Sequence, residues 1–412
     1  MIIKHTCTNG VRVIIEPITT VRSVAIGVWV GTGSRYEELQ NNGISHFLEH
    51  MFFKGTKKRS AKEIAESFDS VGGQVNAFTS KEYTCYYAKV LDTHKSMALD
   101  VLADMFFEST FIEVELEKEK NVVLEEIKMY EDTPDDIVHD CISQASFGTH
   151  PLGYPILGTK ETVKSFTRDD LFAYKEQMYS PDAVVISVAG NVDESFIREI
   201  ESYFGHFTSQ NHEKASEKPI FLFDTKAKKK TTEQAHLCIG FEGLPVGHER
   251  LYDLAILNNI LGGSMSSRLF QGVREERGLA YSIFSYHSSY QDQGLLTIYG
   301  GTGSDQLEKL YAVILKEIED LKHHGVTEKE VMNSKEQLKG NLMLGLESTN
   351  SRMSRNGKNE LLLKRHRSLD EIITQIDAVT LSSVNMLAKD LFDQSFSRAL
   401  ISPKATFPVD KN

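Results

Sequence analysis

The chain has 412 residues, of which 40% are hydrophobic and 25% charged, and its 46 basic and 58 acidic residues give a net charge of −12. This is the composition of a globular protein of two or three domains, which excludes a disordered or fibrous chain. The acidic balance argues against a nucleic-acid-binding protein, because such proteins gain affinity by neutralising phosphates.

The four cysteines, Cys7, Cys85, Cys141 and Cys238, lie far apart and form no Cys-x-x-Cys pair. We therefore expect neither a disulfide framework nor a thiolate zinc site, and a reducing compartment fits this pattern better. The N-terminus lacks the apolar core of a signal peptide, and no stretch approaches the roughly 18 apolar residues of a membrane span. We expect a cytoplasmic protein with no membrane partner.

Strands and helices alternate along the first half of the chain. A hairpin is predicted over residues 2–16 with its turn at Asn9-Gly10, and a buried strand is predicted from the β-branched run at residues 23–30. The other expected elements are helices from about 42 and over 61–70, strand structure over 74–90, helices between about 95 and 131, and a strand over 183–189.

The helix predicted from residue 42 has one apolar face. Its apolar positions have the i, i+3, i+4, i+7, i+8 spacing of a core-facing helix: Ile44, Phe47, Leu48, Met51 and Phe52. Asn41 or Asn42 is expected to cap its start, and Gly55 is expected to end it.

The same helix carries His46, Glu49 and His50 at i, i+3 and i+4, which places the three side chains together along one flank. Two imidazoles four residues apart can both reach one metal ion, and a neighbouring carboxylate can take a proton from water. The order His-x-x-Glu-His is the inverse of the commoner His-Glu-x-x-His zinc motif. The alternative is a surface helix with two ordinary histidines.

A metal site of this kind needs a third protein ligand, and a helix predicted around residues 116–130 offers candidates. Glu119 and Glu126 are two turns apart, so both point the same way, within a largely apolar stripe. Carboxylates in such a stripe are costly unless they are paired or bind a metal, whereas Glu125 is expected to face solvent. The alternative is an ordinary solvated helix face.

Beyond residue 208 the sequence becomes polar and poorly patterned and then enters a lysine-rich run at residues 226–230. The run indicates either an anionic partner or, more usually, a solvated linker or charged edge strand. We predict a first domain at residues 1–208 that carries the metal motif, a linker and start of the second domain at 209–230, and a second domain at 231–412.

The order of elements then starts again. Residues 235–241 match the early strand of the first half. Residues 255–259 (AILNN) correspond to residues 46–50 (HFLEH) of the first half: the two central apolar residues are retained, and the histidines and the glutamate are absent. We predict an α+β fold of two homologous domains, each a mixed or antiparallel β-sheet flanked by helices. The alternative is a coincidence of pattern.

Six segments carry a likeness to a known family: residues 33–37 (GSRYE), 43–56 (GISHFLEHMFFKGT), 73–79 (GQVNAFT), 119–126 (EKNVVLEE), 267–270 (SRLF) and 274–281 (REERGLAY). Through these specific motifs, and over nearly its whole length, the sequence resembles the pitrilysin-type zinc peptidases. That family includes insulin-degrading enzyme and the mitochondrial processing peptidase, and the chain is most similar to short bacterial members that resemble the processing peptidase β subunit.

The resemblance implies a role for each matching residue of the metal motif. His46, His50 and Glu126 would hold one Zn²⁺ per chain. Glu119 would orient a histidine ligand. Glu49 would be the general base that activates water and later protonates the leaving amine.

The resemblance also implies substrate contacts. Asn76, Ala77 and Phe78 match the edge strand along which the family lays an extended or unfolded peptide, by main-chain hydrogen bonding. Arg274 and Tyr281 match a pair in the second half that contacts the substrate and the developing oxyanion.

Family members of double length enclose a chamber with four such units, so the resemblance implies a homodimer of this two-unit chain. Arg274 and Tyr281 of one protomer would then serve the zinc site of the other. The implied activity is a zinc-dependent endopeptidase for short or unfolded peptides. The alternatives are a peptidase-derived structural or assembly subunit and an active subunit that needs a different, inactive partner.

Overall fold

The computed structural model describes residues 2–208 and 217–408, which group into two compact units, each described here by itself. The first unit combines Met1–Lys128, Pro155–Ser216 and Leu344–His366, and the second combines Met129–Tyr154, Glu217–Met343 and Arg367–Asn412. The units therefore exchange segments, whereas the sequence-based division kept each half of the chain together. Residues 209–216 of the expected linker lie outside the described residues.

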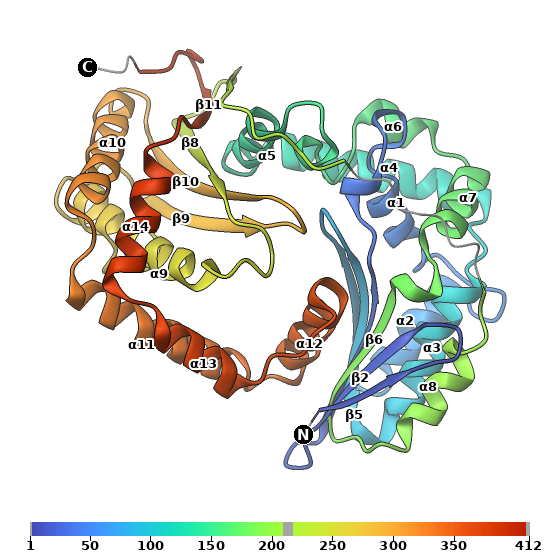
Figure 1. Cartoon of the computed structure of the whole chain (residues 1–412). Helices are drawn as coiled ribbons and strands as arrows, with labels where there is room; N and C mark the ends of the chain where they lie inside the picture. Colours follow the sequence, from blue (N-terminus) through green and yellow to red (C-terminus); the bar gives the residue numbers. More distant parts are fainter. Residues whose placement is uncertain (1, 209–216, 409–412) are drawn as a thin grey trace. The chain divides into compact units, whose positions relative to one another are not determined.

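The first unit is built on a six-stranded sheet in the order β1-β2-β6-β3-β5-β4 (Figure 1). Its strands are β1 (Ile3–Thr6), β2 (Arg12–Pro17), β3 (Ser23–Val30), β4 (Gln74–Thr79), β5 (Thr84–Leu91) and β6 (Val184–Gly190). The β2–β6 pair is parallel and the other pairs are antiparallel. The expected hairpin is present with Ile3 opposite Ile15, and the expected strand structure over 74–90 is a second hairpin, β4–β5.

Helices cover one face of this sheet and enclose a large apolar core with it. They are α1 (Ile44–Met51), α2 (Ala61–Asp69), α3 (Lys95–Glu108), α4 (Glu113–Glu131), α6 (Lys160–Ser165), α7 (Arg168–Met178) and α8 (Phe196–Phe204). Across residues 2–208 and 217–408, no helix has the length and apolar character that crossing a bilayer requires.

The second unit has a five-stranded sheet in the order β7-β11-β8-β10-β9. Its strands are β7 (Thr225–Lys229), β8 (Gln234–Gly243), β9 (Ser282–Ser289), β10 (Gly294–Gly303) and β11 (Ser397–Ser402). Order and direction repeat those of β2-β6-β3-β5-β4, including one parallel pair, β7–β11. The fold of two homologous α+β domains is therefore confirmed, and the lysine-rich run forms the edge strand β7.

One face of the second sheet is covered by helices of the second half of the chain. The helices of this half that belong to the second unit are α9 (Leu251–Leu261), α10 (Leu307–His324), α11 (Glu328–Gly345), α13 (Leu369–Ala378) and α14 (Leu381–Phe392). A π-helical turn at Phe270–Glu275 precedes β9.

The remaining face of each sheet is covered by a helix from the other half of the sequence. α5 (Pro134–Phe147) packs on β8 and β11 of the second sheet, and α12 (Thr349–Leu363) packs on β3 and β6 of the first. Under α12, Trp29 Nε1 donates to Met353 Sδ at 3.4 Å and Ser187 donates to the Met353 carbonyl at 2.7 Å. A Cβ on Gly357 would come within 2.3 Å of Trp29 Nε1, so glycine is required for this close approach.

The exchange explains why the predicted domain boundaries differ from the observed units. An amphipathic helix must bury its apolar face, but its sequence does not state which sheet it will cover. α5 and α12 occupy equivalent places in the two repeats, each after the two α-helices that follow the β-hairpin: α3 and α4 in the first repeat, α10 and α11 in the second. The exchange is therefore reciprocal.

Met353→Ala is expected to destabilise the first unit by about 3 kcal/mol, because this fully buried side chain fills the space between α12 and the sheet. Urea unfolding can be followed by the fluorescence of Trp29, the single tryptophan of the chain, which lies in the same cluster. Met332→Ala, at a side chain that is 61% exposed on α11, is the control and should leave the midpoint unchanged. Equal midpoints for the two variants would contradict this account of α12.

Candidate metal centre

The helix α1 is short, and seven of its eight residues are buried. Gly43 precedes it with a φ of +96°, and no side chain caps the helix from the N-cap position. Instead the buried side chain of Glu37 accepts hydrogen bonds from the amides of Gly43 (2.8 Å) and Ser45 (2.9 Å). The predicted asparagine cap is wrong: the side chain of Asn42 donates to Glu37 and to the Pro155 carbonyl. Each carboxyl oxygen of Glu37 accepts one of these amides, Oε2 that of Gly43 and Oε1 that of Ser45, so one side chain satisfies two donors at the start of α1.

The segment that carries Glu37 is itself fixed against the turn between β4 and β5. The buried Arg35 and Glu82 form an ion pair at 2.7 Å, and the Arg35 amide donates to the Lys81 carbonyl at 2.7 Å. At Gly33 a Cβ would meet the Ser80 carbonyl oxygen at 2.2 Å. The motif at residues 33–37 is therefore a support for the start of α1.

The two histidines of α1 meet the second glutamate of α4. His46 Nε2 and His50 Nε2 are 3.2 Å apart, and the Glu126 carboxylate lies 3.8 Å from the first nitrogen and 3.6 Å from the second. Nitrogen and oxygen atoms bound to one tetrahedral zinc ion at bond lengths of about 2.0–2.2 Å are separated by about 3.3–3.6 Å, close to the observed 3.2–3.8 Å. The observed spacing therefore fits one metal ion held by these three residues.

The pKa values of the two histidines are shifted in opposite directions. Burial lowers the pKa of His46 to about 3, so its imidazole is neutral. Burial opposes protonation of His50, but its hydrogen bond with Glu119 and the charges of Glu126, Glu119 and Glu49 outweigh burial and raise its pKa. Burial also raises the pKa of Glu119, yet its hydrogen bonds with His50 and Lys54 lower it more.

Glu119 determines which nitrogen of His50 is free. Its carboxylate lies 2.8 Å from His50 Nδ1 and 2.7 Å from Lys54 Nζ. As an ionised acceptor it keeps a proton on Nδ1, which leaves the Nε2 lone pair directed at His46 and Glu126. Electron-rich atoms that converge in this way favour a cation between them. Glu125, by contrast, is exposed and paired with Lys128, as expected.

Glu49 lies on the same flank of α1 but outside this group of ligand atoms. It is buried, and its Oε2 accepts a hydrogen bond from Thr79 Oγ1 at 2.6 Å. Burial raises the pKa of Glu49, and the hydrogen bond from Thr79 opposes this. Sequence reasoning assigned no role to Thr79, Glu37 or Lys54. Their only signal was a place inside the motifs that carry the family resemblance.

The three residues expected to bind substrate lie on β4, whose outer edge has no neighbouring strand in the described residues. The Asn76 side chain accepts a hydrogen bond from the Ala77 amide at 2.8 Å. Phe78 packs its ring against Trp29, Tyr83 and Tyr87. Successive strand residues face opposite ways, so Phe78 lies on the face opposite to Thr79 and Glu49.

Arg274 and Tyr281 form a pair within the second unit. The Arg274 guanidinium lies 4.4 Å from the centre of the Tyr281 ring and 4.8 Å from that of Phe270, and it donates to the Tyr281 carbonyl at 3.1 Å. The side chain of Tyr281 is 79% exposed. The pair therefore presents an aromatic ring and a cation together to solvent.

Comparisons with known proteins agree with the fold and the motif. The family model described as Insulinase (Peptidase family M16) matches residues 12–160, and the one described as Peptidase M16 inactive domain matches 165–338. The chain is similar to the uncharacterized zinc protease YmxG of Bacillus subtilis, with 65% identity over 99% of this chain and 100% of that protein. An uncharacterized zinc protease of Streptomyces coelicolor is 40% identical, with 97% and 89% covered.

Two solved structures share the fold over the full length. A protease from Helicobacter pylori has a TM-score of 0.91 at 22% identity and covers 98% of this chain and 99% of its own. A Pseudomonas fluorescens structure titled peptidase M16 inactive domain has a TM-score of 0.89 at 18% identity, with 100% of both chains covered.

Repeated sheets, the His-x-x-Glu-His helix and relatives named as zinc proteases define a zinc protease homologue. The chain belongs to the insulinase family of peptidases, peptidase family M16. The expected family is therefore confirmed. The match to an inactive domain covers residues 255–259, where the histidines and the glutamate of the first half are absent.

Glu37→Ala is expected to lower the stability of the first unit by about 2–4 kcal/mol, because it leaves buried amides at the start of α1 without an acceptor. Bound zinc after dialysis should fall as well, since α1 carries two of the ligand side chains. Thermal unfolding and metal analysis measure the two effects. Glu38→Ala, at the exposed neighbouring residue, is the control. Unchanged stability and metal content in Glu37→Ala would contradict the capping role.

Proposed function

We propose that the chain is a zinc-dependent endopeptidase that hydrolyses short or unfolded peptides bound in extended form. The observation that carries this proposal is the group of His46, His50 and Glu126 beside a buried Glu49, which is itself hydrogen-bonded to the free edge strand β4. A metal position, a base and a strand that can pair with a peptide thus lie together in one unit.

Each residue of this group has a separate task. His46, His50 and Glu126 hold one zinc ion, and Glu119 keeps the His50 imidazole in the tautomer that leaves Nε2 free. When bound there, zinc would act as a Lewis acid that polarises the peptide carbonyl and lowers the pKa of a water molecule.

Glu49 accepts the proton of the attacking water and passes it to the leaving amine. Thr79 holds the base in place through its hydrogen bond to Glu49 Oε2. Because Thr79 ends β4, the same strand that binds the peptide positions the base.

The outer edge of β4 offers main-chain groups to a substrate. The Ala77 amide now donates a hydrogen bond to the Asn76 side chain. A carbonyl of an extended peptide can accept this hydrogen bond instead, and the peptide then adds to the sheet as a further strand. The Phe78 ring is engaged with Trp29, so this position contributes backbone and little side-chain selectivity. Such binding suits unfolded peptides of varied sequence.

We further propose that the chain acts as a homodimer in which Arg274 and Tyr281 of one protomer serve the zinc site of the partner. The exposed Tyr281 ring with the Arg274 guanidinium stacked on it is suited to contact a substrate and a developing oxyanion. The proposal rests on the four-unit chamber of double-length family members.

Glu49→Gln is expected to retain zinc and lose cleavage of a quenched peptide library by about 10²–10⁴-fold, because the amide cannot accept the proton from water. Glu125→Gln, a matched change at an exposed glutamate of α4, is the control and should cleave like the wild type. Full activity in Glu49→Gln would overturn the role of the base. A zinc-loaded wild type that cleaves no peptide would favour a structural subunit.

Mixing Glu49→Gln chains with Arg274→Ala chains is expected to restore about a quarter of wild-type activity, since half of the dimers are mixed and each has one complete site. Differently tagged chains refolded together and purified through both tags provide the mixed dimer. A mixture of Glu49→Gln with His50→Gln is the control and should stay inactive. Mixed dimers of the first kind without activity would contradict the shared site.

A further inference from the structure

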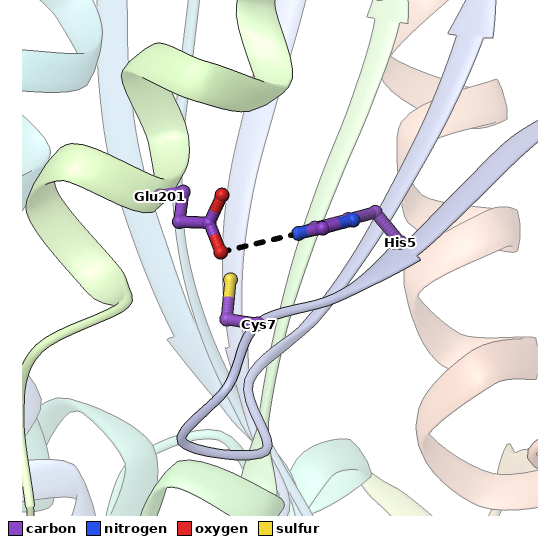
Figure 2. Close-up of side chains that lie close together, drawn as sticks. All are labelled: His5, Cys7 and Glu201. Atoms are coloured by element: carbon purple, nitrogen blue, oxygen red, sulfur yellow. Dashed lines mark hydrogen bonds and ion pairs between the residues drawn. The ribbon is translucent and has the colours of Figure 1, made fainter.

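A second group of side chains that could hold a metal ion, drawn in Figure 2, lies at the edge of the first sheet that β1 forms. His5 belongs to β1, Cys7 directly follows that strand, and Glu201 belongs to α8. One ligand atom from each residue lies within 4.8 Å of the other two, and His5 Nε2 is 3.4 Å from Glu201 Oε1. The three side chains therefore converge on one point from two elements.

The sequence places these side chains together for simple reasons. His5 and Cys7 are two residues apart, so both point to the same face of the strand, the one that α8 covers. The turn after Cys7 is tied to the end of α8, because the Asn9 side chain donates to the carbonyls of Phe204 and Phe207, each at 2.9 Å. The Cys7 amide also donates to the Val11 carbonyl at 2.8 Å. The turn that carries Cys7 and the helix α8 are thus held together by hydrogen bonds that do not involve the three ligand side chains.

We propose that His5, Cys7 and Glu201 form a second metal site, which takes a divalent ion of intermediate softness such as Zn²⁺. Thiolate, imidazole and carboxylate are the three ligand types that zinc accepts in proteins. The 3.4 Å between His5 Nε2 and Glu201 Oε1 matches the separation of about 3.3–3.6 Å between nitrogen and oxygen atoms bound to one tetrahedral zinc ion. This site is distinct from that of His46, His50 and Glu126.

An ion would satisfy a thiol that has little else to bind. Cys7 is only 3% exposed, and the hydrogen bond that opposes the effect of burial on its thiol comes from its own backbone. Burial raises the pKa of the Cys7 thiol, and the Glu201 charge raises it further. A bound cation reverses both effects, since it stabilises thiolate and carboxylate together. From the sequence we expected no thiolate zinc site, because the chain has no Cys-x-x-Cys pair. That reasoning did not cover a single cysteine that binds a metal together with a histidine and a glutamate.

The site has a structural consequence. β1 has four residues and pairs only with β2, so it is the edge strand of its sheet in the described residues. A metal ion bound by His5 and Cys7 on one side and by Glu201 on the other fastens this strand to α8. Three protein ligands would leave the fourth position of a tetrahedral ion to water. The first unit thereby becomes more stable when metal is available.

Cobalt substitution tests this site separately from the first one. Co²⁺ bound to a thiolate gives a sulphur-to-metal charge-transfer band in the near ultraviolet, and the group of His46, His50 and Glu126 contains no sulphur. The metal-free chain titrated with Co²⁺ is expected to show this band. Cys7→Ser and His5→Gln should lose or strongly weaken it, and Cys141→Ser, at another free thiol, should keep it.

A second measurement covers the case in which a cysteine variant fails to fold. Zn²⁺ at about 100 times its dissociation constant should raise the Tm of wild type by about 5 °C more than that of Glu201→Gln, whose side chain is partly exposed. No charge-transfer band in the wild-type chain, or a band that persists in Cys7→Ser, would overturn the proposal. If only the group of His46, His50 and Glu126 fails to bind metal, the charge-transfer band should be unchanged, because that group contains no sulphur.

Discussion

The arrangement of the metal centre depends on how the start of one short, buried helix is satisfied. An α-helix leaves its first four amides without partners inside it, and water cannot reach them when seven of the eight residues of α1 are buried. Glu37 supplies the missing acceptor, and the ion pair of Arg35 with Glu82 fixes the segment that carries it. The axial position of α1, and with it the position of both imidazoles, follows from this contact.

Around this helix, each polar side chain is held by a partner from another element. Glu119 and Lys54 fix the His50 ring, and Thr79 at the end of β4 fixes Glu49. Both Glu49 and Glu119 are buried, but their pKa values shift in opposite directions. Burial raises the pKa of Glu49, whereas hydrogen bonds with His50 and Lys54 outweigh burial and lower the pKa of Glu119. The candidate site is therefore a network in which side chains from strand β4 and from helices α1 and α4 orient one another through direct contacts.

Local patterns in the sequence predicted much of this, and contacts between distant segments account for what was missed. Helical spacing placed His46 and His50 on one flank and Glu119 with Glu126 on one stripe, and β-branched runs located β3, β6 and β8. The hydrogen bond of Thr79 to Glu49 joins residues 30 apart, and nothing in either segment alone indicates it. The asparagine cap was wrong because a buried carboxyl group from outside the helix took its place. The exchange of α5 and α12 was not predicted, because an amphipathic pattern shows that one face of a helix is buried but not which sheet that face packs against.

The exchange of α12 also bears on how the protein is made. The face of the first sheet that includes Ile14, Ala25 and Val185 is buried with Met353 of that helix. On the ribosome this face stays uncovered until α12 has been translated, about 160 residues after the last helix of the first half. At about 5–20 residues per second the delay is about 8–30 s. During that time the nascent chain exposes an apolar sheet face, which is a surface that a chaperone recognises, so the first unit completes its folding only near the end of synthesis.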